Sequence, residues 1–539
     1  MEKQPENQQH SAAKAAASDK NIVAKKTAKS SLLRSSLIVG TMTMLSRVLG
    51  LVRDIVVANF FGASEAADAF FVAFKIPNFL RRLFAEGAFS QAFVPVLSEY
   101  RTQRDLNAVQ ALVGKVAGGL GGILLVITVV AVIAAPLLTA VFAPGFYMHA
   151  EDKFDLASQM LAITFPYLML ISLTAFAGAI LNSYEHFVVP AFTPVLLNLC
   201  LIGSATLLSP YFEQPVFALA WGVLMAGCVQ LLFQVPFLMR IKLLPKPVID
   251  WQDPGVKRIL TLMLPALFGV SVAQINLLLD TVLATFLQTG SVSWLYYSDR
   301  LAELPLGVFA IAISTVILPS LSRKSASSSM QDFAKTLDWA MRMILLIGLP
   351  SALALFYLAE PLLVTLFGYG NMSERDILMA GQSLRAYSCG LLAFMLIKVL
   401  APGYFARQDM KTPVKIAIQA MVANMVFNLI LIYPFAHVGL AAATAMSAFL
   451  NAFLLLYGLL KIGVFKWQQG WGVMLLRLLA GCSALWISMA FFNQDLEQWL
   501  QWGVWQRVLN MGLIVSVGVV SYLAVLMLLG LRKRHIVAH

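Results

Sequence analysis

The chain has 539 residues, of which 59% are hydrophobic and 12% are charged, and its formal net charge is +12. Its mean hydropathy of +0.78 excludes a soluble globular protein of this length and indicates a polytopic membrane protein. The four cysteines have neither CxxC nor Cys/His spacing, so neither a disulfide framework nor a cysteine metal site is predicted.

Residues 1–30 are polar and carry several lysines without apolar periodicity, which predicts a disordered tail. No short apolar core with a small-residue cleavage site comes before the first long apolar run. A signal peptide is therefore not expected.

Fourteen apolar runs follow, and each is long enough to cross a hydrocarbon core of about 30 Å as a helix. The predicted fold class is an all-α polytopic membrane protein with fourteen transmembrane helices. Their approximate limits are 35–61, 66–97, 110–142, 156–183, 191–208, 215–240, 257–288, 292–321, 337–366, 377–405, 413–434, 438–460, 472–493 and 505–531.

The basic residues of the loops indicate how the chain is oriented. If the N-terminus is cytoplasmic, the outer loops contain only Lys153 and Arg375, and the other loop bases lie on the inner side. By the positive-inside rule this predicts an even number of spans and two cytoplasmic termini. Because the bases are divided among short loops, no nucleic-acid partner is expected.

Similar segments recur about 220 residues apart, which indicates an internal repeat. FVPVLSEY (93–100) resembles ILPSLSRK (317–324), and ALAWGVLMAG (218–227) resembles GLAAATAMSA (439–448). This offset equals six spans, so the two copies have the same orientation across the membrane. Such parallel repeats are typical of transporters that bind substrate between two rocking lobes. A duplicated scaffold or membrane-embedded enzyme without moving lobes is the alternative.

The repeat divides the chain into a tail, two lobes and a remainder. The predicted parts are a cytoplasmic tail at 1–30, an N-lobe with spans 1 to 6 at 31–245, a C-lobe with spans 7 to 12 at 246–465, and the last two spans with the C-terminus at 466–539.

Charged residues inside the spans predict a polar cavity, since each costs about 2.5–3.5 kcal/mol at a helix centre. In the second span Lys75, Asn78, Arg82 and Glu86 are spaced 3, 4 and 4 apart, which puts them on one helix face, and Arg81 lies beside that face. The first and eighth spans add a further set: Ser46, Arg47, Arg53, Asp54, Ser293, Asp299, Arg300 and Glu303.

These charges predict an anionic cargo. Each arginine could instead be neutralised by a neighbouring acid, but Arg47, Lys75 and Arg81 would remain, which predicts a net positive cavity. Guanidinium groups bind phosphate oxygens bidentately, so a phosphate or diphosphate is the expected ligand.

A second polar cluster is a candidate sodium site, since Asp280, Asn424, Asn428 and Thr444 could supply hard oxygen ligands. The alternative is hydrogen bonding between buried amides, worth about 0.6 kcal/mol per contact. Membrane potential acting on the cavity charges is an equally available driving force. No cofactor other than Na⁺ is expected.

Four motifs together resemble the MurJ/MviN family of bacterial lipid II flippases, and the likeness runs from about residue 33 to 530. The motifs are SRVLGLVRD (46–54), DAFFVAFKIPNFLRRLFAEGAFSQAFVPVLSEY (68–100), GSVSWLYYSDRLAELPLGV (290–308) and KVLAPGYFARQDMKTPVKIA (398–417).

The resemblance implies a multidrug/oligosaccharidyl-lipid/polysaccharide exporter fold with a V-shaped cavity, in the bacterial inner membrane. It implies a monomer that moves undecaprenyl-diphosphate-linked lipid II to the periplasmic leaflet, with spans 13 and 14 beside a groove for the lipid tail and with cell-wall synthesis or division proteins as partners. The functional positions that it implies are Ser46, Arg47, Arg53, Asp54, Asp68, Asn78, Arg81, Arg82, Glu86, Ser293 and Arg300.

Enzymatic function is not predicted, because no GxSxG, P-loop, HExxH or paired-carboxylate pattern occurs in a suitable context. A flippase for another lipid-linked oligosaccharide remains the alternative within transport. A membrane-embedded transferase acting on such a lipid is the alternative from another class.

Overall fold

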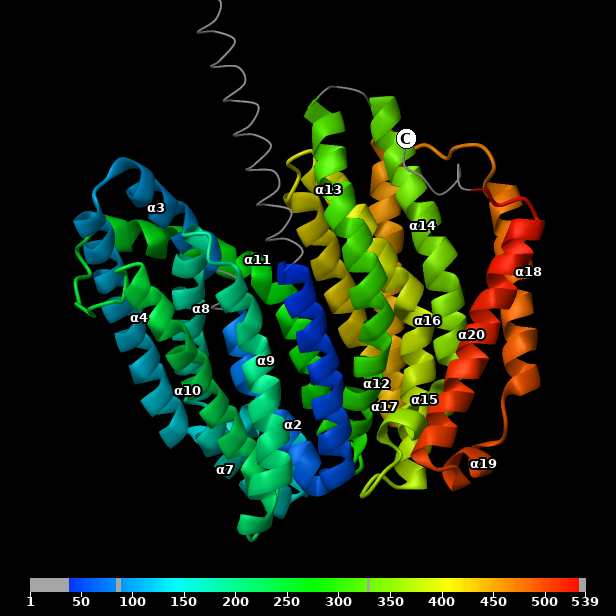
Figure 1. The fold of residues 1–539 in the computed structure, drawn as a ribbon, viewed down its shortest axis with the longest axis horizontal. Coiled ribbons are helices and arrows are strands. Elements are labelled where there is room, and N and C mark those ends of the chain that lie inside the picture. The colour runs from blue at the N-terminus through cyan, green and yellow to red at the C-terminus, as the bar shows by residue number, and fades with distance from the viewer. Residues whose placement is uncertain (1–37, 84–88, 327–329, 533–539) are drawn as a thin grey trace, which may run out of the picture.

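The computed structural model describes residues 38–83, 89–326 and 330–532, and within these ranges the chain is helical without strands (Figure 1). The first described helix covers residues 38–61. The longer elements after it are α2 (Glu65–Arg81), α3 (Ser90–Gln103), α4 (Leu106–Ile133), α5 (Ala135–Phe142), α7 (Glu151–Thr164), α8 (Tyr167–Ser183), α9 (Val188–Gly203), α10 (Phe217–Arg240), α11 (Pro254–Ala284), α12 (Ser291–Pro305), α13 (Ile311–Ala326), α14 (Met330–Tyr357), α15 (Ala359–Phe367), α16 (Glu374–Phe405), α17 (Lys411–Lys461), α18 (Trp471–Phe492) and α20 (Val504–Leu528). The short helices are α6 (Pro144–His149) and α19 (Leu496–Gln501).

This architecture confirms the all-α membrane fold class, and fourteen spans are consistent with it. Nine helices of the described residues are long and apolar enough to cross a membrane. One of them, α17, contains two predicted spans, which a non-helical residue separates at Ala436 (φ 48°, ψ −126°). The eighth predicted span is divided into α12 and α13 by the π-helical turn η4 (Leu306–Ala310), which follows Pro305.

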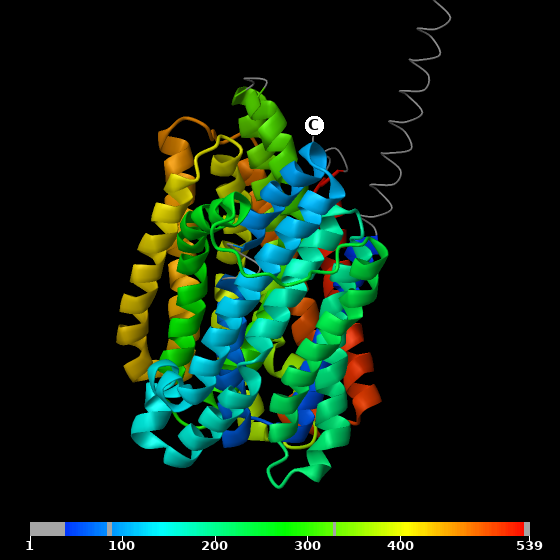
Figure 2. The ribbon, with the colours of Figure 1, turned by 90° about the vertical axis from the view of Figure 1, so that its left-hand side faces the viewer.

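The helices form two bundles that run along a common direction in two perpendicular views (Figures 1 and 2). The first bundle contains the helices up to α10, and the second contains α12 to α17. The pair α18 and α20 packs beside the second bundle, on α14 and α15. The long helix α11 contacts α3 in one bundle and α17 in the other, so the exact lobe boundaries stay a prediction.

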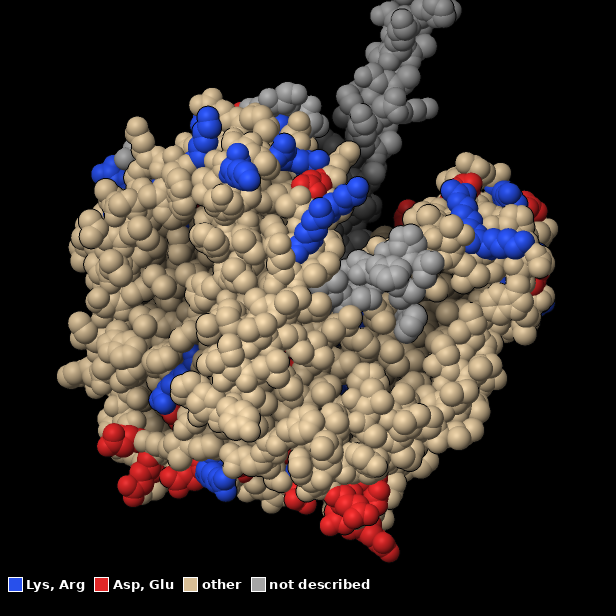
Figure 3. Space-filling view, turned by 180° about the vertical axis from the view of Figure 1, so that it is seen from behind, with Lys and Arg blue, Asp and Glu red and all other residues tan. Residues whose placement is uncertain are grey.

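The two ends of the molecule differ in charge. Lysine and arginine gather at one end of the space-filling view, and aspartate and glutamate gather at the other (Figure 3). The basic end is notched between the two bundles. We refer to these as the basic end and the acidic end.

A linker segment, residues 241–253, connects the bundles and lies along α4. The Val248 amide donates to the Gly114 carbonyl oxygen (3.0 Å), and Lys115 Nζ forms ion pairs with Asp250 (2.9 Å) and Asp253 (2.8 Å). The Lys115 ammonium lowers the pKa of the Asp250 carboxyl, so the ion pair stabilises the fold above the ordinary carboxyl range and is lost as the pH falls below it. The start of α11 is thereby fixed to the first bundle.

Replacing Gly118 tests this attachment, because a Cβ there would collide with the Val248 backbone carbonyl. We expect Gly118→Ala to lower the free energy of unfolding by about 1–3 kcal/mol, measured by thermal unfolding in detergent. Gly121→Ala is the matched control, since its Cβ would meet nothing within 4 Å. Equal stability of the two variants would contradict the packing of the linker segment on α4.

Candidate functional site

A central cavity lies between the two bundles and encloses about 1210 Å³ of space free of atoms, part of it open to solvent. Its walls come from α2 in the first bundle and from α11, α12, α16 and α17. The charged and amide side chains that line it are Lys75, Asn78, Arg82, Gln274, Asp280, Asp299, Arg300 and Glu303.

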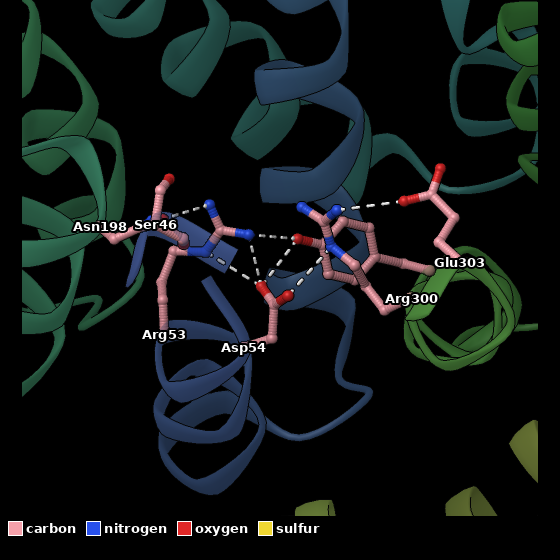
Figure 4. Close-up of polar contacts among 7 residues, drawn as sticks. Ser46, Arg53, Asp54, Asn198, Arg300 and Glu303 are labelled. Carbon is pink, nitrogen blue, oxygen red and sulfur yellow. Dashed lines mark hydrogen bonds and ion pairs between the residues drawn. The ribbon is translucent and has the colours of Figure 1, made fainter. Parts of the chain in front are cut away.

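Asp54 joins the two bundles beside this cavity, and its side chain is almost fully buried (Figure 4). One carboxylate oxygen accepts from Arg53 (Nη2 at 2.6 Å, Nε at 3.0 Å) and from the Tyr296 hydroxyl at 2.9 Å. The other oxygen lies 3.0 Å from Arg300 Nε, as an ion pair without the alignment of a hydrogen bond. A single carboxylate of the first bundle thus holds guanidinium groups from both bundles.

Neighbouring polar groups fix the orientation of Arg53. Its Nη1 donates to Asn198 Oδ1 (3.1 Å) and its Nη2 also donates to the Tyr296 hydroxyl (3.1 Å). The Asn198 amide in turn donates to the Ser46 carbonyl oxygen at 3.0 Å. Because these contacts occupy Nε and both terminal nitrogens, Arg53 is held rigidly and offers little freedom for movement.

Arg300 is less constrained, with 38% of its side chain exposed. Besides Asp54, it contacts Glu303 Oε2 at 3.4 Å, and Glu303 is itself half exposed. Its guanidinium carbon lies 5.5 Å from the centroid of the Tyr296 ring. Arg300 therefore retains donors that can turn toward a ligand in the cavity.

A smaller pocket adjoins the cavity on the side of the first helix. Ser46, Arg47 and Asn198 line it together with Arg300 and Glu303, which also line the central cavity. The Arg47 guanidinium lies against Gly307 of η4, where any Cβ would collide with it. The absence of a side chain at Gly307 thus lets an arginine of the first bundle reach the second.

The predicted charges of the second span lie at different places. Asn78 and Arg82 line the cavity, and Arg81 Nε donates to Asn78 Oδ1 at 3.1 Å. Among the described residues, Arg82 forms no ion pair. Glu86 lies outside the described residues. Lys75 also lines the cavity, and the negative charges that act on it come from Asp299, Asp280 and Glu303.

The positive charge of the region is smaller than the arginines suggest. Among the described residues, five bases and four acids line the central cavity and the adjoining pocket together. Arg53 is paired with a local carboxylate, and Arg300 is shared between Asp54 and Glu303. Within the part of the chain that the structure describes, Arg47, Lys75 and Arg82 form no ion pair with a carboxylate.

Asp68 and Ser293 are described residues that do not line the cavity, and they belong to the first turns of α2 and α12, which begin at the acidic end (Figures 1 and 3). Asp68 accepts from the Ser293 hydroxyl (2.6 Å), the Ser293 amide (3.0 Å) and the Gly290 amide (2.7 Å), and Lys153 Nζ lies 3.6 Å away. Its carboxylate thereby caps the N-terminus of α12 from the other bundle. These contacts hold the bundles together at that end, and a direct role of either residue in substrate binding stays a prediction.

The predicted sodium ligands do come together. Asp280 accepts from Asn428 Nδ2 (2.7 Å) and from the Thr444 hydroxyl (2.9 Å), and Asn424 and Asn428 are fully buried on α17. The side chains of Asn424 and Asn428 also bond to each other, at 2.9 Å. One acid, amide oxygens and a hydroxyl fit a monovalent hard cation.

Sequence reasoning missed Tyr296, Asn198 and Gly307, although each positions a predicted arginine. Tyr296 and Gly307 lie within the motif at 290–308 that also contains Arg300, and this proximity in the chain could have indicated them. Asn198 is 145 residues from its partner Arg53, and no spacing rule connects the two.

Comparisons with known proteins identify the family. The protein-family model described as lipid II flippase MurJ matches residues 57–511 of this chain. The chain belongs to the MurJ family. A probable lipid II flippase MurJ of Vibrio cholerae is 51% identical over 95% of this chain and 99% of its own length. A lipid II flippase MurJ of Burkholderia cenocepacia is 44% identical over 82% of this chain and 86% of its own length.

Solved structures agree with this assignment. The lipid II flippase MurJ in an inward closed conformation has a TM-score of 0.76 at 27% identity, over 91% of this chain and 98% of that one. An inward-facing multidrug resistance MATE family transporter of the MOP superfamily shares the fold, with a TM-score of 0.67 at 15% identity over 80% of this chain. MurJ relatives are named as flippases, which confirms a transporter and not an enzyme.

The two acids around Arg300 should differ in their effect on stability. Asp54→Asn removes the buried partner of two guanidinium groups and should cost about 3 kcal/mol or more in free energy of unfolding. Glu303→Gln removes an exposed partner and should cost at most about 1 kcal/mol. Thermal unfolding of both variants in detergent measures the difference, and similar losses would show that Asp54 does not join the bundles.

Proposed function

We propose that this protein moves lipid II, the undecaprenyl-diphosphate-linked peptidoglycan precursor, from the cytoplasmic to the periplasmic leaflet of the inner membrane. Membership in the MurJ family supports the substrate. The observation that carries the mechanism is the cavity between the bundles, where Arg300 of one bundle meets Asp54 of the other. A site made by both lobes can change its access when they rock.

The orientation follows from the charge of the two ends. Cytoplasmic loops are enriched in lysine and arginine, so the basic end would face the cytoplasm with both termini. The bundles contact each other at the acidic end through Asp68, Ser293 and Gly290. In this state the cavity would accept a head group from the cytoplasmic leaflet and would be closed toward the periplasm.

A diphosphate would bind by taking the place of a cavity carboxylate as the partner of an arginine. Arg82 has an exposed guanidinium, and Arg300 can leave the weakly held Glu303 while Asp54 keeps its Nε in place. Each charge-assisted hydrogen bond to a phosphate oxygen contributes about 1.5–3 kcal/mol. The ligand would screen the repulsion between arginines of the two bundles, which permits the loaded carrier to close at the basic end.

Replacing the arginines that face the cavity tests the proposed carrier. We expect Arg82→Ala and Arg300→Ala to reduce lipid II movement at least tenfold while folded protein remains, because each loses phosphate contacts worth about 1.4 kcal/mol or more. Leaflet-resolved measurement of lipid II in cells that depend on each variant gives the rate.

Arg375→Ala is the matched control, because Arg375 bonds to Gln288 outside the cavity. A normal rate of lipid II transfer in the Arg300 variant would contradict the proposed binding of the diphosphate by Arg300. A normal rate in cells depleted of the protein would assign it another lipid-linked saccharide as cargo.

We further propose that Asp280, Asn424, Asn428 and Thr444 hold Na⁺ and that the ion gradient contributes to driving transport. The convergence of the Asp280 carboxylate, the Thr444 hydroxyl and the buried Asn424 and Asn428 side chains supports this assignment. When bound, the ion would balance the negative charge of Asp280, which the hydrogen-bond donors of Asn428 and Thr444 otherwise stabilise. The site lies at the end of α11 that packs on α17, whereas the start of α11 is fixed to the first bundle.

Transport in sealed vesicles tests the ion. We expect lipid II movement to rise with a Na⁺ gradient and Asp280→Asn to lose this response, since the variant lacks the charge that a cation requires. Gln274→Ala, on the same helix and in the cavity wall, should keep the sodium response. Sodium-independent transport by the unsubstituted protein would leave the membrane potential as the driving force.

A further inference from the structure

A second cavity lies between the second bundle and the end of α18 with the segment that follows it, and its lining residues differ from those of the central cavity. It encloses about 910 Å³ of space free of atoms and opens at the surface. Its lining includes Tyr357, Glu360, Arg385, Trp486 and Asp495. Trp486 lies six residues before the end of α18, which is about 9 Å along the helix.

The walls of this cavity are fixed by one buried arginine. Arg507 of α20 donates to the carbonyl oxygens of Trp499 (3.0 Å), Leu500 (2.8 Å), Gly368 (2.7 Å) and Val364 (3.3 Å). These carbonyls lie at the ends of α19 and α15, so Arg507 ties the helix pair to the second bundle. The cavity is consequently a built site and not a gap between independent parts.

Its floor carries one charge of each sign. Arg385 Nη2 donates to Glu360 Oε2 at 2.5 Å, and Arg385 Nε donates to the Phe356 carbonyl oxygen at 3.4 Å. Arg385 Nη1 and Glu360 Oε1 make no hydrogen bond with any other residue in the described ranges. The Arg385 side chain is 40% exposed, so Arg385 Nη1 and Glu360 Oε1 remain available to bind a ligand.

The remaining walls are suited to a cation. The Tyr357 and Trp486 rings pack edge to face, with centroids 4.6 Å apart. Aromatic faces attract ammonium groups, and the exposed carboxylate of Asp495 at the rim adds negative charge. The site therefore offers one guanidinium for an anion, and two carboxylates with an aromatic pair for a nearby cation.

We propose that this second cavity binds the head group of a zwitterionic phospholipid, phosphatidylethanolamine. The phosphate accepts from Arg385 Nη1, and the primary ammonium donates to Glu360 Oε1 and lies against the Trp486 ring. An anionic head group such as phosphatidylglycerol has no cation for the two acids. Phosphatidylcholine has a cation but no N–H donor for Glu360, so it binds less tightly than phosphatidylethanolamine.

Native mass spectrometry of the full chain with added phosphatidylethanolamine, phosphatidylglycerol or phosphatidylcholine tests the proposal. We expect phosphatidylethanolamine to bind with about tenfold preference over phosphatidylglycerol, since one charge-assisted hydrogen bond distinguishes them. Glu360→Gln keeps an oxygen for Arg385 but removes the charge that binds the ammonium, and should abolish this preference. Arg385→Gln should weaken all three lipids.

Arg375→Gln on the same helix serves as control and should leave the preference unchanged. Thermal unfolding checks that each variant is folded, and Asp495→Asn at the exposed rim should reduce the preference in part even if Arg385→Gln does not fold. Equal binding of phosphatidylethanolamine and phosphatidylglycerol by the unsubstituted protein would overturn the proposal. A preference that persists in folded Glu360→Gln would overturn it too.

Discussion

The structure depends on one buried carboxylate that serves two positive charges. Asp54 has lost nearly all contact with water, and an isolated charge there would be costly. Arg53 compensates it from the same helix, and Arg300 and Tyr296 compensate it from the other bundle. The same group therefore connects the bundles and keeps the arginines oriented. A transporter needs this combination, because its binding groups must be held firmly while the two halves remain separable.

The contacts between the bundles are unequal along the membrane normal. At the acidic end, Asp68 caps α12 across the interface with short hydrogen bonds to Ser293 and Gly290. At the basic end the bundles are separated by a notch (Figure 3). The helix α11 connects the two bundles. The linker segment fixes its start to the first bundle, and Asp280 near its other end bonds to α17 of the second. A change at Asp280 can thus act on the angle between the bundles.

The sequence predicted the helical class and the correspondence of helices to apolar runs, because a span needs about 20 apolar residues whatever its neighbours are. Spacing also predicted that Asn78 and Arg82 share a face, since that depends only on the helix period. Interruptions were harder to predict. The π-helical turn after Pro305 and the non-helical Ala436 lie inside long apolar stretches, where composition does not change.

By itself, the sequence determined which residues carry charge into the membrane, their order along each helix and the family to which the chain belongs. Only the tertiary structure decided which of these charged side chains pair with other groups of the protein. Asp54 pairs with Arg300 across 246 positions of the chain, and Asp68 caps a helix of the other bundle, so the net charge available to a ligand is smaller than the arginines alone suggest. The physical reason is that electrostatic attraction and desolvation depend on distance in space, and helix packing sets that distance.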